Sequence, residues 1–201
     1  MESFIISTLM LGIMAQIYTF GEKVERYEQV DRDMRAEIDG ADTGLGVSLP
    51  RTSRQSQLVL NLDKVFGDKH FFWVGFYTLA GKGNTIMKGA SQGQRYMVVG
   101  PYRGSHGCPV IPLNNGVCGY AARSREIVIV DDTHNWQSPD GIGEHIACDS
   151  ASNSEIVVPI ISRNGSLIGV LDCDSSEYAA FDQTDKNWLD SLVRKYIAPQ
   201  V

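Results

Sequence analysis

Residues 145–159 read HIACDSASNSEIVVP and change character in the middle. Small, polar, turn-forming residues give way at Ile156 to a β-branched run, which predicts a buried strand. Cys148 therefore lies in a loop at the mouth of a strand. A strand holds neighbouring side chains in place while a loop leaves them accessible, so this position is typical of a functional thiol.

A second apolar run, residues 168–174, reads IGVLDCD and ends in two carboxylates separated by one residue. Because alternate residues of a strand point to the same side, we expect Asp172 and Asp174 on one face of the sheet. The dipeptide Asn164-Gly165 between the two runs is a strong hairpin signal. The two runs are therefore predicted to be joined as a hairpin.

The remaining elements follow from helical periodicity and from aromatic or β-branched runs. Helices are expected at residues 22–38, 51–66 and 182–197, with a turn entering a shorter helix at 114–122. Further strands are expected at 71–79, 95–100, 110–113 and 126–130, and irregular loops at 80–94 and 131–143. Two helices, then mostly sequential strands, then a helix indicate an α+β fold with an antiparallel sheet.

The length of the chain and its charged residues exclude some classes of protein. The chain has 201 residues, enough for one domain with a substantial core. It carries 18 basic and 24 acidic residues, with no basic cluster interleaved with aromatics, so nucleic acid is not an expected partner. Four cysteines without a convincing secretion signal predict a cytoplasmic location, where thiols stay reduced unless they do redox chemistry.

Residues 1–16 are interpreted as an N-terminal extension and residues 17–201 as the domain. Residues 4–13 are apolar, but Glu2 and no Lys or Arg precede them, and the run is shorter than the roughly 20 residues of a membrane span. We therefore expect neither a signal peptide nor a membrane anchor. Either translation begins at Met14, or the extension forms a helix that packs on the domain or on a partner.

The cysteines lie at positions 108, 118, 148 and 173, so no two of them form a C-x-x-C motif. The histidines form no cluster with them at the spacing of metal ligands, so no zinc site is expected. Cys173, in a strand between carboxylates, fits a small buried side chain. The other three each lie in a turn-forming loop or at a helix start. Because a helix N-terminus lowers the pKa of a thiol, these positions predict reactive thiolates.

The acidic residues Glu155, Asp172 and Asp174 form a second candidate site. A single carboxylate at a strand end is as often solvated as functional, but three together would attract a cation. Trp73 and Tyr77 share one face of another predicted strand, and aromatic faces add cation-π attraction. The set predicts a pocket for a small ligand that carries an ammonium group.

These motifs resemble those of the free methionine-(R)-sulfoxide reductases, a family of single GAF-domain enzymes. The matching stretches are WVGFY (73–77), GPYRG (100–104), GVCG (116–119), HIACD (145–149), NSEIVVP (153–159) and IGVLDCD (168–174). Three cysteines at these positions distinguish the reductases from GAF domains that only bind ligands. The resemblance implies a GAF-like fold with a central antiparallel sheet of about six strands and flanking helices.

The resemblance also implies a mechanism for the thiols. Cys148 is the nucleophile that attacks the sulfoxide sulfur, and methionine leaves behind a sulfenic acid. Cys108 is the resolving thiol that condenses with it to a disulfide, and Cys118 is a second thiol able to take part in disulfide relay. An external dithiol, thioredoxin or a related protein, regenerates the enzyme, so no cofactor and no metal are expected.

For the pocket, the resemblance implies that Glu155, Asp172 and Asp174 hold the ammonium group and assist protonation of the sulfoxide oxygen. It also implies that Trp73 and Tyr77 enclose the methyl and sulfoxide end of the substrate. A peptide-bound methionine has no free ammonium group and would be rejected. The loops 80–94 and 131–143 are longer than the family pattern, as is the N-terminus.

Two other functions remain open at this point. A GAF module that binds a small ligand and regulates a partner would leave three loop cysteines unexplained. A structural zinc protein would need a ligand cluster that the spacing does not provide. Self-association into a homodimer is also left open.

Overall fold

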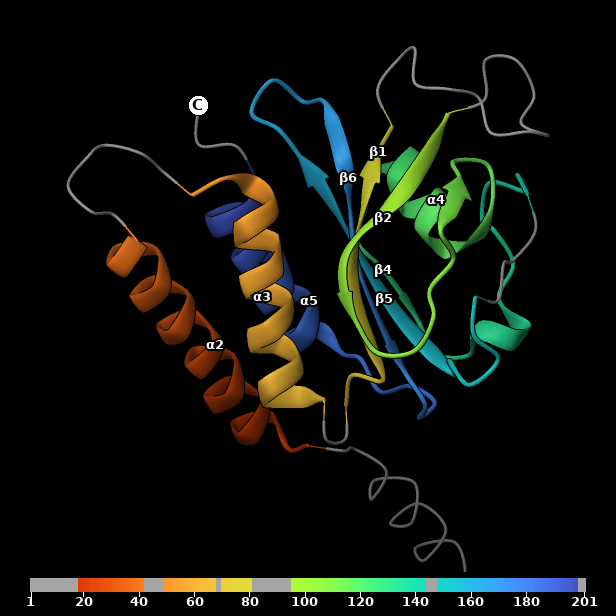
Figure 1. The fold of residues 1–201 in the computed structure, drawn as a ribbon. Helices are drawn as coiled ribbons and strands as arrows, with labels where there is room; N and C mark the ends of the chain where they lie inside the picture. The colour runs from red at the N-terminus through yellow and green to blue at the C-terminus, as the bar shows by residue number, and fades with distance from the viewer. Residues whose placement is uncertain (1–17, 42–48, 68–69, 81–94, 144–147, 199–201) are drawn as a thin grey trace, which may run out of the picture.

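A six-stranded antiparallel sheet is the central layer of the computed structural model, which describes residues 18–41, 49–67, 70–80, 95–143 and 148–198 (Figure 1). The strand order is β3-β2-β1-β6-β5-β4. The strands are β1 (Trp73–Leu79), β2 (Tyr96–Arg103), β3 (Val110–Pro112), β4 (Val128–Val130), β5 (Ser154–Ile161) and β6 (Leu167–Ser175).

Helices cover both faces of this sheet, as Figure 1 shows. One face carries α2 (Phe20–Ala41), α3 (Arg51–Phe66) and α5 (Gln183–Leu192), which a π-helical turn extends to Ile197. The other face carries α4 (Gly116–Ser124). This arrangement confirms the predicted α+β fold with a sheet of about six antiparallel strands.

Strand alternation divides the hydrophobic core into two parts. On β1, Val74 and Phe76 pack into the larger core under α2, α3 and α5, whereas Trp73 and Tyr77 belong to a smaller core beside α4. Cys173 of β6 lies fully buried in the larger core, in agreement with its interpretation as a small buried side chain. The predicted functional residues therefore face α4, away from the main helical layer.

Some predicted boundaries were wrong, most clearly that of β2. The strand was expected to end at Gly100, but β2 continues through Pro101 to Arg103 because Tyr102 pairs with Gly75 and Arg103 with Val74. The register of this pair shifts between Gly75 and Tyr77. Proline is tolerated at such irregularities because no ladder hydrogen bond is required there.

Several expectations concern residues outside the described ranges. The extension at residues 1–16 and nearly all of the loop at 80–94 belong to this group. The predicted loop at 131–143 is described and contains a short 3-10 helix, Thr133–Asn135. In the described part of the chain, no helix combines the length and apolarity that crossing a membrane requires.

A buried ionic network joins α2 to the start of α5. The ammonium group of Lys23 donates to Asp185 at 2.6 Å and to Asp182 at 2.9 Å, although Lys23 is only 2% exposed. Asp185 Oδ1 also accepts from the Tyr27 hydroxyl at 2.8 Å and lies 3.2 Å from His70 Nε2. A buried charge is tolerated only when it is paired, so this network fixes α2 against the domain.

The network makes the free energy of unfolding depend on pH in the acidic range. Burial alone would raise the pKa of Asp185, but the contact with His70 and the charge of Lys23 outweigh it and lower the pKa to about 2. This stabilisation is present above the unfolded pKa of 3.8 and is lost as pH falls toward 2. We expect a loss of about 2 kcal/mol in the free energy of unfolding across this window.

Urea unfolding followed by tryptophan fluorescence between pH 5 and about 2 measures this effect. Asp185→Asn should flatten the pH dependence. Asp190→Asn, on the exposed side of the same helix, is the matched control and should leave it unchanged. An unaltered acid slope in Asp185→Asn would show that the network is not its source.

Candidate active site

A pocket opens on the α4 side of the sheet. Seven of the eight residues predicted for the site line it: Trp73, Tyr77, Cys118, Cys148, Glu155, Asp172 and Asp174. The eighth, Cys108, is bonded to Cys148 at its mouth. Thiols, carboxyls and aromatic rings that are up to 101 positions apart in the sequence thus meet in one cavity.

The Cys108–Cys148 disulfide joins two loops. The two Cα atoms are 5.2 Å apart, within the roughly 7 Å that a disulfide requires. Cys148 is exposed, and Cys108 is partly buried. Gly107 lets the first loop pass over the aromatic wall, because a Cβ there would lie 2.9 Å from the ring of Trp73 and 3.0 Å from the hydroxyl of Tyr77.

Strand register brings the three carboxyls together. Asp174 pairs with Glu155 of β5 on one side and with Trp73 of β1 on the other. Asp172 pairs with Gly75, so its side chain lies on the same face two residues along β6. Glu155 and Asp172 are only 7% and 6% exposed, which removes most of the water that would stabilise their charges.

This burial changes the titration of the cluster. It raises the pKa of Asp172 to about 6. For Glu155 and Asp174, burial and then the charge of Asp172 raise the pKa well above its usual range. Like charges that share a dry site cannot all ionise, so the cluster retains a proton at neutral pH and is able to donate it.

Cys118 lies in the first turn of α4, as predicted, but its expected activation is wrong. Burial raises the pKa of its thiol, and the nearby Asp172 and Glu155 raise it further. Desolvation and two acidic neighbours outweigh the helix N-terminus, because each disfavours the thiolate. The surroundings of Cys118 therefore favour the protonated thiol.

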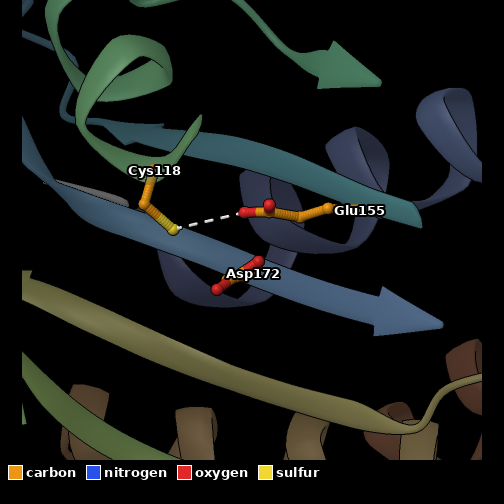
Figure 2. Close-up of side chains that lie close together, drawn as sticks. All are labelled: Cys118, Glu155 and Asp172. Atoms are coloured by element: carbon orange, nitrogen blue, oxygen red, sulfur yellow. Dashed lines mark hydrogen bonds between the residues drawn. The ribbon is translucent and has the colours of Figure 1, made fainter. Parts of the chain in front are cut away.

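Figure 2 shows Cys118 pointing toward Glu155 and Asp172. The thiol donates to Glu155 Oε1 at 3.8 Å, and one ligand atom from each of the three residues lies within 4.8 Å of the others. Thiolate and carboxylate are ligand types that zinc accepts. A thiol whose pKa is raised would have to lose its proton first, which opposes metal binding.

The aromatic wall depends on a glycine. The rings of Trp73 and Tyr77 stack with centroids 5.8 Å apart, and Trp73 also stacks on Tyr102. A Cβ on the intervening Gly75 would lie 2.4 Å from the Trp73 ring. Without a side chain at position 75, the indole can fold along the strand and close one side of the pocket.

Two buried polar atoms of the pocket lack a partner within the described structure. They are Trp73 Nε1, a donor, and Asp172 Oδ1, an acceptor. Buried polar groups are nearly always hydrogen-bonded, so an unpaired donor and an unpaired acceptor in one cavity indicate a ligand that satisfies both.

The sequence interpretation missed several lining residues, among them His106, Thr133 and Ser152. The Ser152 hydroxyl donates to Asp174, and the Thr133 hydroxyl donates to the carbonyl of Ser152 at 2.6 Å. Ser152 could have been suspected, because it lies in the polar run after Cys148. Thr133 lies in a loop without periodicity, where the sequence carries no comparable signal.

The fold and pocket define the class of protein. The family profile of the GAF domain matches residues 58–196. Free methionine-R-sulfoxide reductase of Escherichia coli is 36% identical over 171 residues, covering 85% of this chain and 86% of that protein. The chain belongs to the free methionine-R-sulfoxide reductase family.

Two further comparisons agree with this assignment. Free methionine-R-sulfoxide reductase of Saccharomyces cerevisiae is 40% identical over 123 residues, covering 61% of this chain and 59% of the yeast protein. The X-ray structure of free methionine-R-sulfoxide reductase from Neisseria meningitidis in complex with its substrate superposes with a TM-score of 0.69. It is 32% identical and covers 91% of this chain and 93% of that one.

The site predicts two populations of thiol. In the oxidised protein, Cys118 and Cys173 are free but buried, so an aromatic disulfide reagent should label neither quickly and both after unfolding. After mild reduction, Cys108 and Cys148 should react at once. Counting released thiolate with and without denaturant tests this, and fast labelling of the native oxidised chain would contradict the burial of Cys118.

Proposed function

We propose that the chain reduces free L-methionine-(R)-sulfoxide to methionine, with Cys148 as the nucleophile. The observation that carries this proposal is the Cys108–Cys148 disulfide at the mouth of a pocket walled by buried carboxyls and aromatic rings. Membership of the reductase family and the substrate complex of the Neisseria meningitidis relative support it.

The carboxyl cluster would receive the ammonium group of the substrate. Asp172 Oδ1 is buried without a partner in the described structure, and burial raises the pKa of this carboxyl only to about 6, which leaves it mainly ionised at neutral pH. An ammonium group would satisfy this oxygen and offset the repulsion among Glu155, Asp172 and Asp174. The indole N–H of Trp73 would be available to the sulfoxide or carboxylate oxygen.

In the first half-reaction, the Cys148 thiolate attacks the sulfoxide sulfur while an acid protonates the oxygen. An acid is needed because oxide is a very poor leaving group. Glu155 and Asp174 are the candidate donors, since burial and Asp172 hold a proton on them at neutral pH. Methionine leaves, and Cys148 remains as a sulfenic acid.

In the second half-reaction, Cys108 condenses with this sulfenic acid to form the disulfide. An external dithiol, which we take to be thioredoxin or a related protein, would then reduce it by exchange. Cys148 is the exposed member of the pair and would be the sulfur attacked. Cys118 stays a candidate for disulfide relay, but its burial means that relay requires movement of α4 or of the cysteine loops.

Other parts of the proposal follow from this cycle. It uses protein thiols and an external dithiol, so it requires no bound cofactor. The cytoplasm is the compartment proposed, because dithiol reductants are maintained there. The division into an extension at 1–16 and a domain at 17–201, and assembly into a homodimer, remain predictions.

The reaction is tested by following consumption of free methionine-(R)-sulfoxide with dithiothreitol as reductant. We expect turnover of the (R) epimer and none of the (S) epimer. Cys148→Ser should lower kcat/KM by at least about 1,000-fold, because the covalent step is lost. Cys173→Ala, which removes the free thiol on the opposite face without burying a hydroxyl, is the matched control. A folded, reduced wild-type chain without turnover would favour a ligand-binding GAF module instead.

Recognition of the ammonium group gives a separate prediction. N-acetylmethionine sulfoxide lacks that charge and should be reduced at least about 100-fold less efficiently, because the buried carboxyls would be left unpaired. Asp172→Asn should lose most of the preference for the free amino acid over the N-acetylated one, because only turnover of the free amino acid should weaken. Comparing kcat/KM for the two substrates in both proteins measures this; a preference unchanged in Asp172→Asn would place ammonium recognition elsewhere.

A further inference from the structure

The two disulfide-forming loops come from distant parts of the sheet. The loop of Cys108 connects β2 to β3, and the loop of Cys148 leads into β5. Strands β1 and β6 lie between β2 and β5 in the sheet order. Strand pairing therefore cannot hold these loops together, and something else must keep their sulfurs within reach.

One hydrogen bond links the loops beside the disulfide. The Ser105 hydroxyl donates to Asp149 Oδ2 at 2.6 Å. Ser105 lies three residues before Cys108, and Asp149 directly follows Cys148. Within the described ranges, this is the one side-chain hydrogen bond between residues 104–109 and 148–153.

The acceptor is held in place by its own loop. Asp149 Oδ1 accepts from the backbone N–H of Ala151 at 2.9 Å, so the carboxylate cannot rotate freely and Oδ2 is directed at Ser105. The hydrogen bonds from Ser105 and then from Ala151 lower the pKa of Asp149, which keeps it ionised at neutral pH. A hydrogen bond to a charged acceptor is stronger than one between neutral groups.

We propose that Ser105 and Asp149 form a clasp that holds Cys108 against Cys148 and speeds resolution of the sulfenic acid. Ser105 is a positioning residue in this scheme, since it acts through the loop and not on the substrate. Holding two reactants together raises their effective concentration without changing their chemistry. The kinetic part of this inference rests on the proposed function.

The resolving step is balanced within the protein. The Cys108 thiolate attacks the sulfur of the Cys148 sulfenic acid, the S–S bond forms and the S–O bond breaks. Hydroxide leaves and combines with the proton that Cys108 released, giving water. The Cys108 sulfur is oxidised and the Cys148 sulfur is reduced, so this step needs no external reductant.

Single-turnover kinetics separate the clasp from the chemistry before it. Reduced protein is mixed with free methionine-(R)-sulfoxide without reductant, and methionine and disulfide are measured over time. In Ser105→Ala we expect the methionine burst at the wild-type rate and disulfide formation about five- to tenfold slower. The delayed sulfenic acid should be trapped by dimedone. Ser105→Thr, which keeps the hydroxyl, should restore fast disulfide formation.

The control is a bond of equal length elsewhere. Ser162 Oγ donates to Asn164 Oδ1 at 2.6 Å in the exposed β5–β6 hairpin, so Ser162→Ala removes a serine hydrogen bond of the same length away from the cysteine loops and should leave both rates unchanged. Asp149→Asn keeps an acceptor but loses the charge and should slow disulfide formation to an intermediate degree. Disulfide formation at the wild-type rate in a folded Ser105→Ala would overturn the clasp.

A second measurement does not depend on the substrate. The protein is equilibrated in mixtures of reduced and oxidised dithiothreitol. The equilibrium constant for forming the Cys108–Cys148 disulfide should be about fivefold smaller in Ser105→Ala than in the wild type. If the wild type forms no methionine, the proposed function fails while this equilibrium still tests the clasp. Equal constants in the two proteins would contradict the clasp even when turnover is normal.

Discussion

The pairing of β1, β6 and β5 is the constraint on which the rest of the site depends. The residues on one face of this three-stranded segment include Trp73 and Tyr77, Asp172 and Asp174, and Glu155. A slip of one residue would turn each of these side chains toward the helical core. Cys173 illustrates the consequence, because it lies one position away and is buried among apolar residues on the other face.

This register brings three carboxyls together in one pocket, where the burial of Glu155 and Asp172 makes charge costly. The raised pKa values are the direct result, and they supply two properties that reduction of an amino-acid sulfoxide needs. In the proposed reaction, an ionised Asp172 would attract the ammonium group, and a protonated neighbour would act as the acid. The same repulsion that destabilises the empty site makes a cationic ligand favourable.

The two faces of the sheet have separate tasks. The helical face carries the larger core and the ionic network around Lys23, and among the described residues no member of either lines the pocket. The opposite face is less thickly covered, so the loops before β3 and β5 can cross it and meet over the pocket. A rigid sheet with reactive loops on one side suits a cycle in which thiols must approach, bond and separate.

The sequence by itself determined the order of helices and strands, because helical and alternating periodicities are local properties of the chain. It also singled out Cys148 and the carboxyls as candidates, because they occur in motifs close to predicted strand ends, and the structure brings them to one pocket. It could not determine that Cys118 would be buried beside Glu155 and Asp172, since that depends on how α4 packs over β5 and β6.

The extent of β2 and the roles of Thr133 and Ser105 also depended on tertiary structure. Pairing with β1 extends β2 beyond Gly100, where the predicted strand ended. The hydrogen-bond partners of Thr133 and Ser105 lie 19 and 44 residues away in the sequence. A local sequence pattern cannot predict contacts over such separations. The sequence thus determined which elements form and which residue types can react. The ionisation and the hydrogen-bond partners of the site side chains were decided by the tertiary structure, because it brings distant loops together and buries the groups between them.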